Sequence, residues 1–128
     1  MQTLKTRPEF LRTASARRQG AGSFLLQARF RDDENSLVRV GFTASKKVGN
    51  SVMRNRARRR LREIARAVLP KLGHAGWDYV LVARPGATIE RDYHLLLADM
   101  EQAVRQIHAP PRPRSDRPSE KTPEKAAK

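Results

Sequence analysis

The chain has 128 residues, of which 38% are hydrophobic, and its formal net charge is +14. A chain of this length can bury one modest core, so we expect a single domain. The charge favours nucleic acid as the partner over an acidic protein or a membrane. No apolar stretch approaches the roughly 20 residues that span a bilayer, and the first six residues lack the apolar segment of a secretory signal, so we expect a cytoplasmic protein. The absence of cysteine excludes disulfides and thiolate metal sites.

The first predicted element is a short helix. Thr6, Pro8 and Glu9 have the form of a capping box with proline in the first turn. We expect the helix to run to about Arg17, because the two glycines in residues 20–22 then interrupt it.

Two strands are predicted next, joined by an acidic turn of hairpin length at residues 32–36. Residues 23–31 and 37–45 both alternate between apolar and polar side chains, so each strand has one apolar and one polar face. The apolar faces consist of Phe24, Leu26, Ala28, Phe30, Val38, Val40, Phe42 and Ala44. The polar faces consist of Gln27, Arg29, Arg31, Arg39, Gly41, Thr43 and Ser45, and continue to Lys47.

The polar sheet face is a candidate surface for single-stranded RNA, because its side chains offer several hydrogen-bond donors. Phe10 on the first helix could add a stacking surface, or it could be a core residue. The sequence leaves both roles open.

A long helix is predicted from a cap at Asn50 or Ser51 to about Leu69, ending at Pro70. Its apolar stripe consists of Ala57, Leu61, Ile64, Ala65, Val68 and Leu69. Residues 77–83 predict a buried strand, and Asp92 can cap a last helix. The predicted order is α-β-β-α-β-α, which indicates an α+β fold in two layers.

Positive charge is concentrated between residues 46 and 66, where Glu63 is the only acid. Arg58, Arg62 and Arg66 form one row at one-turn spacing, which can neutralise successive phosphates. The basic residues are Lys46, Lys47, Arg54, Arg56, Arg58, Arg59, Arg60, Arg62 and Arg66. A solvated helix face is the alternative, but such faces usually mix charges of both signs, so we favour binding to RNA or DNA.

Catalytic motifs are absent from the sequence. His74, His94 and His108 have no companion residues at metal-ligand or triad spacing, and the acidic residues 32–34 are best explained as a turn. Glu90 and Asp92 are close together, but too few carboxylates converge on them to favour an autonomous nuclease.

The composition changes at Ala109, after which prolines alternate with charged and small residues. We expect residues 109–128 to be a disordered, proline-rich and basic tail, and residues 1–108 to be the folded domain.

The basic region resembles the signature of the protein subunit of bacterial ribonuclease P. The resemblance rests on Ser-Lys-Lys-Val-Gly-Asn at 45–50, Val-Met-Arg-Asn-Arg at 52–56, and the basic residues 59, 60 and 62 followed by Glu63. Residues 8–10, 40–42 and 79–85 also fit the family, and the resemblance covers residues 4–107.

The resemblance implies a ribosomal protein S5 domain 2-like fold, with a left-handed βαβ crossover where the general rule would give a right-handed one. One more short strand is expected in the family after the first helix, although residues 19–23 are short for it. It also implies the noncatalytic, RNA-binding subunit of a ribonucleoprotein endonuclease that removes the 5′ leader of precursor tRNA. The catalytic RNA and its magnesium ions would perform the hydrolysis, with one protein monomer per RNA.

Two sites follow from the resemblance. The RNA subunit would be bound by Lys46, Arg54, Asn55, Arg56, Arg58, Arg59, Arg60, Arg62 and Arg66. The leader would lie on Phe10, Gln27, Thr43, Ser45 and Lys47, to which the alternation of the strand adds Arg29. Ala14 and Gln27 stand where the family often has aromatic residues, so stacking should be weaker here. A metal site on the protein is not predicted, and a general or ribosomal RNA-binding protein is the alternative function.

Overall fold

The computed structural model describes residues 1–109, so the predicted tail lies almost entirely outside the described residues. The elements are β1 (Gln2–Thr3), α1 (Arg7–Ala14), β2 (Arg17–Gly20), β3 (Phe24–Phe30), β4 (Arg39–Thr43), the 3-10 helix η1 (Lys46–Val48), α2 (Ser51–Leu72), β5 (Trp77–Ala83), α3 (Ala87–Glu90) and α4 (Tyr93–Ile107). The six predicted elements are present, and β2 is the additional short strand that the resemblance implies after the first helix. The sequence did not predict β1 and α3. Within residues 1–109, no helix is long and apolar enough to cross a membrane.

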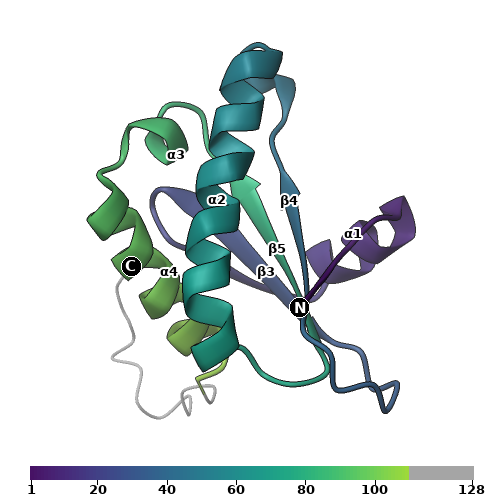
Figure 1. Cartoon of the computed structure of the whole chain (residues 1–128). Helices are drawn as coiled ribbons and strands as arrows, with labels where there is room; N and C mark the ends of the chain where they lie inside the picture. The colour runs from purple at the N-terminus through teal and green to yellow at the C-terminus, as the bar shows by residue number, and fades with distance from the viewer. Residues whose placement is uncertain (110–128) are drawn as a thin grey trace, which may run out of the picture.

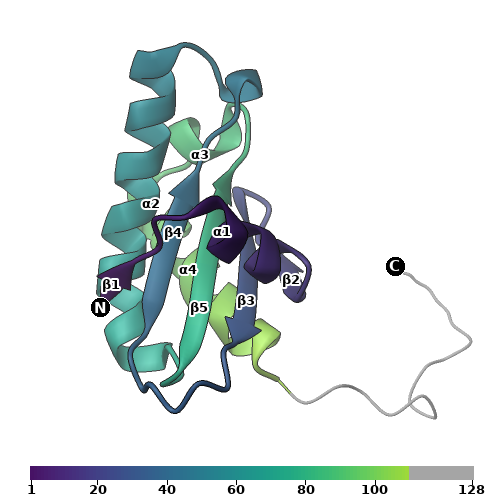
Figure 2. The ribbon, with the colours of Figure 1, turned by 90° about the vertical axis from the view of Figure 1, so that its right-hand side faces the viewer.

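The strands form one mixed sheet in the order β1-β4-β5-β3-β2. β4 runs parallel to β5 and β1, whereas β3 is antiparallel to both of its neighbours, β5 and β2. α2 and α4 cover one face of the sheet, and α1 crosses the opposite face (Figures 1 and 2). The α+β prediction is therefore confirmed, with α1 outside the two predicted layers.

The core lies between the sheet and the pair α2 and α4. The apolar stripe predicted for the long helix is entirely buried there. Burying one such large side chain contributes about 1.5–3 kcal/mol relative to leaving it exposed. The largest fully buried side chains are Phe24, Leu26, Leu61, Ile64, Leu69, Tyr79, Leu81, Leu96 and Met100. Phe30 was predicted to belong to this face, but it lies at the end of β3 and is 53% exposed.

The helix α1 begins as predicted and ends early. The Thr6 hydroxyl accepts from the Glu9 amide, and the Glu9 carboxylate accepts from the Thr6 amide. The predicted end near Arg17 is wrong, because the chain from Arg17 pairs with β3 to form β2. Residues 19–23 are short for an additional strand, but β2 forms because the turn between β2 and β3 is tight. Gly22, with a φ of 81°, makes that turn possible.

The helix α2 passes through Pro70, where the sequence predicted its end, and continues to Leu72. The missing amide of Pro70 costs one hydrogen bond, but the Gly73 amide donates to the Leu69 carbonyl at 2.8 Å, and Leu72 packs against the core. β4 is shorter than the predicted 37–45, because Ser45 already caps η1. β1 and α3 are too short for sequence periodicity to reveal them.

Candidate nucleic-acid interface

The basic region begins with two consecutive caps. The Ser45 hydroxyl accepts from the Lys47 amide at 3.3 Å, and the Asn50 side chain accepts from the Met53 amide at 2.9 Å. Between them Gly49 has a φ of 143°, and a Cβ there would lie 2.6 Å from the Met53 sulfur. These caps hold Lys46 and Lys47 in an exposed turn directly before the arginines of α2.

The predicted RNA-contacting residues cover the outer surface of α2. Asn55, Arg56, Arg59, Arg62 and Arg66 are exposed, as are the lysines of η1, while Arg54, Arg58 and Arg60 are half-buried. Within residues 1–109, none of the nine basic side chains forms an ion pair with an acidic one. Their charge is therefore not neutralised by the described part of the protein.

Three of these arginines also contact the protein itself. Arg60 donates to the backbone carbonyls of Thr88, Ile89 and Arg91, so it fixes the end of α3 against α2. The guanidinium of Arg62 lies 5.6 Å from the centre of the Phe42 ring. Arg58 donates to the Asn55 side chain at 2.6 Å. The hydrogen bonds of Arg60 therefore give it a structural role. A contact between Arg60 and RNA stays a prediction.

On the opposite sheet face, α1 covers one row of paired residues, which we call the middle row. It consists of Gly41, Val80, Gln27 and Arg18, one from each of four neighbouring strands. The Phe10 ring lies directly on Gly41, where a Cβ would be 2.5 Å from the ring. Val80 is 1% exposed and Gln27 is 8% exposed. Phe10 is therefore seated on the sheet, and Gln27 is buried rather than open.

The helix α1 separates the predicted leader-binding residues. Thr43 belongs to the row Thr43, Val82, Leu25 and Gly20, which lies on the side of η1 and which we call the η1-side row. Arg29 belongs to the row Arg39, Asp78 and Arg29 on the other side of the middle row, which we call the network row. Thr43 thus ends β4 on the side where Ser45 and Lys47 follow in the chain, and Arg29 lies on the other side of the middle row. The predicted continuation of the strand face to Lys47 is wrong, because Lys47 lies in η1.

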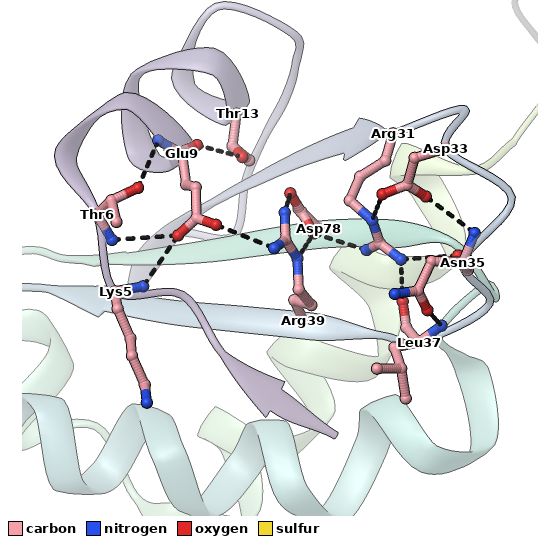
Figure 3. A network of polar contacts seen from close by, with 10 residues as sticks. All are labelled: Lys5, Thr6, Glu9, Thr13, Arg31, Asp33, Asn35, Leu37, Arg39 and Asp78. Carbon is pink, nitrogen blue, oxygen red and sulfur yellow. Dashed lines mark hydrogen bonds and ion pairs between the residues drawn. The ribbon is translucent and has the colours of Figure 1, made fainter.

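The network row is largely neutralised by ion pairs (Figure 3). Asp78 accepts from Arg31 at 2.7 Å and from Arg39 at 2.8 and 2.9 Å. Arg39 also donates to Glu9 of α1 at 2.9 Å. The backbone amides of Thr6 and Lys5 lower the pKa of Glu9 to about 2. This network joins α1 to the sheet and keeps Arg31 and Arg39 occupied, whereas Arg29 forms no ion pair within residues 1–109.

The structure adds residues that the sequence did not single out. Leu25 and Val82 are half-buried beside Thr43 and give the η1-side row an apolar floor. The guanidinium of Arg84 reaches the same end of the sheet, because a Cβ on Gly20 would lie 3.7 Å from it. Alternation along residues 77–83 could have indicated Val82, but no local signal indicated Arg84. Residues 1–109 hold no group of three or more His, Cys, Asp or Glu side chains arranged for a metal ion.

The fold and these surfaces define a class: small, basic α+β proteins with an arginine-rich helix on one face of a mixed sheet. The family model described as Ribonuclease P matches residues 1–108. The chain is 58% identical over 111 residues to the Ribonuclease P protein component of Ruegeria pomeroyi. The aligned region covers 86% of this chain and 89% of that protein. The protein of the same name from Caulobacter vibrioides is 48% identical over 103 residues, with 80% of this chain and 68% of that protein covered.

The chain therefore belongs to the bacterial ribonuclease P protein family. Its fold is similar to that of the RNase P protein from Thermotoga maritima, with a TM-score of 0.71 at 22% identity over 85% of this chain and 100% of the other. At this level of identity, the likeness supports the fold alone.

Proposed function

We propose that this chain is the RNA-binding subunit of a ribonuclease P ribonucleoprotein that removes the 5′ leader of precursor tRNA by endonucleolytic cleavage. One protein would bind one catalytic RNA in the cytoplasm. The RNA subunit with magnesium would carry out the hydrolysis, and the protein alone would not be catalytic. Membership in the family supports the ribonucleoprotein role. The finer fold class, with its left-handed crossover, stays a prediction from the resemblance.

The catalytic RNA would bind along the arginine-rich surface of α2. The observation that carries this proposal is the set of nine basic side chains in residues 46–66 without an acidic partner in residues 1–109. Phosphate oxygens would supply acceptors for such side chains, and counterion release would make the affinity fall steeply with salt.

The leader would bind on the η1-side row with Ser45 and Lys47, against the exposed edge of α1. Leu25 and Val82 offer apolar contact for bases, whereas Lys47 and Arg84 offer charge for phosphates. Gln27 and Phe10 lie between α1 and the sheet, where they would support this surface. Ala14 would leave the stacking area of α1 small, as the sequence predicted.

The test is 5′ maturation of a precursor tRNA by a bacterial ribonuclease P RNA at low magnesium, with and without the protein. We expect cleavage only when both are present. The double variant Arg56→Ala/Arg59→Ala should lose the rescue, whereas Arg105→Ala, an exposed arginine of α4, should retain it. Tight RNA binding without rescue would instead favour a general RNA-binding protein, and cleavage without any RNA subunit would favour an autonomous nuclease.

A further inference from the structure

Arg18 and Gly20 are the residues of the edge strand β2 that face the α1 side of the sheet, and of these two only Arg18 carries a side chain. Its neighbours face the other way, because Arg17 donates to the Ile107 carbonyl of α4 at 2.9 Å and Gln19 donates to Gln106 of α4 at 2.9 Å. Side chains alternate along a strand, so Arg18 lies on the same face as its partner Gln27. It ends the middle row at the open edge of the sheet.

The charge of Arg18 is unused within the described part of the chain. Arg31 and Arg39, on the same sheet face, are held by Asp78, Asp33 and Glu9. Arg18 is exposed, and no acidic side chain in residues 1–109 forms an ion pair with it. An exposed guanidinium of this kind can donate two parallel hydrogen bonds to a phosphate.

Arg18 also continues the surface proposed for the leader. The η1-side row ends at Gly20, two residues along β2 from Arg18, or roughly 7 Å at the usual rise of a strand. Arg84 lies beside Gly20. Side chains that can contact nucleic acid therefore extend from Lys47, across β4, β5 and β3, to β2. The strand β2 follows α1 in the chain and forms an edge of the sheet (Figure 2).

Resting on the proposed function, we infer that the leader crosses the sheet from Lys47 to the β2 edge, and that Arg18 binds one of its distal phosphates. The crossing from β4 to β2 covers three strand spacings, or about 14 Å. At about 3.4 Å per stacked nucleotide, about four nucleotides span it, and an unstacked strand spans it with fewer. A one-nucleotide leader therefore ends before Arg18, and an eight-nucleotide leader passes it.

In this arrangement, binding of the leader depends more on contacts to its phosphates than on stacking of its bases. Gln27 is buried and Ala14 is small, so few bases can stack there. Arginine at the distal end holds the backbone whatever the base, because every nucleotide carries the same phosphate. Arg18 thus selects for leader length and not for leader sequence.

The experiment measures the dissociation constant of the assembled holoenzyme for one precursor tRNA with a leader of one or of eight nucleotides, over a range of salt concentrations. We expect Arg18→Ala to weaken binding of the long leader about fivefold and to make its salt dependence shallower by about 0.7 logarithmic units per decade, the value for one contact to a single strand. Binding of the short leader should not change. Arg18→Lys should recover much of the loss, because it keeps the charge.

Arg105→Ala is the matched control, since it removes an exposed arginine from the helix on the other face of the sheet. An equal loss for both leaders with Arg18→Ala, or the same loss with Arg105→Ala, would overturn the assignment of Arg18. So would long-leader binding that Arg18→Ala leaves intact. If the wild-type protein improved neither binding nor cleavage of either precursor, the proposed function itself would be wrong.

Discussion

Two arginines of α2 and two arginines of the sheet face beneath α1 have opposite surroundings. Arg59 and Arg66 are exposed and have no acidic partner within residues 1–109. Arg31 and Arg39 hold Asp78 between them, with Asp33 and Glu9 at the two ends (Figure 3). Three carboxylates therefore hold Arg31 and Arg39 within the fold, whereas Arg59 and Arg66 remain available to a polyanion.

The largest effect is expected from breaking the network at its centre. Asp78→Ala removes a carboxylate that is 1% exposed and leaves the buried Arg31 side chain with the exposed Asp33 as its acidic partner within residues 1–109. Losing one partner of a buried ion pair costs about 3–5 kcal/mol in the free energy of unfolding. Urea unfolding measures this loss. Glu63→Gln, at an exposed acid of α2, is the control, and a loss below about 1 kcal/mol for Asp78→Ala would contradict the central role of the network.

Two adjacent arginines of α2 sharpen the comparison within one helix. Arg60→Ala deprives three carbonyls around α3 of their donor, so it should lower the free energy of unfolding by about 1.5–3 kcal/mol. Arg59→Ala should leave stability within about 0.5 kcal/mol and weaken binding to the ribonuclease P RNA. Thermal unfolding and filter binding separate the two roles. Equal effects of both variants on stability would remove the distinction.

Gly41→Ala tests how closely α1 sits on the sheet. The new Cβ would lie 2.5 Å from the Phe10 ring, so either the ring or the helix must move. Overpacking of this kind costs about 1–3 kcal/mol. In the Phe10→Ala background the same change should cost much less, and a double-mutant cycle from urea unfolding measures that coupling. If the two changes proved additive, the ring would not be held on Gly41.

The smallest effect concerns a basic side chain that the fold keeps neutral. The His108 ring stacks on His74 at 3.5 Å and lies 2.6 Å from the Tyr79 hydroxyl, measured from Nε2. Burial, together with the neighbouring His74 and Arg17, lowers the pKa of His108 from 6.5 to about 4. Between pH 4 and pH 6.5, the unfolded state binds more protons at His108 than the folded state does. The contribution of His108 to the free energy of unfolding is therefore complete above pH 6.5 and is lost as the pH falls towards 4.

Urea unfolding at pH 7 and pH 5 should therefore show a loss from His108 of about 1 kcal/mol, since the partly exposed ring is screened by solvent. His108→Gln should make the decrease shallower. His94→Gln, at an exposed histidine of the same helix, should not. A decrease that is identical in wild type and His108→Gln would assign the pH dependence to other groups.

Local patterns determined much of the fold. The capping box at Thr6 and Glu9, the buried stripe of α2 and the bounds of β5 were all confirmed. Each of these features depends on residues that are close together in the sequence. Capping hydrogen bonds and the period of the hydrophobic residues can therefore be recognised in the sequence itself. The family signature was equally local, and the family match confirmed it.

The sequence by itself determined that the charge is concentrated on α2 and that the sheet has one polar face. Only the tertiary structure decided what each polar residue does, because the partners lie far apart in the chain. Asp78 neutralises arginines that precede it by 47 and 39 residues, and Phe10 lies on Gly41, so half of the polar face is closed. Pairing of β2 with β3 likewise placed Arg18 at the open edge of that face, which no periodicity within residues 17–20 could indicate.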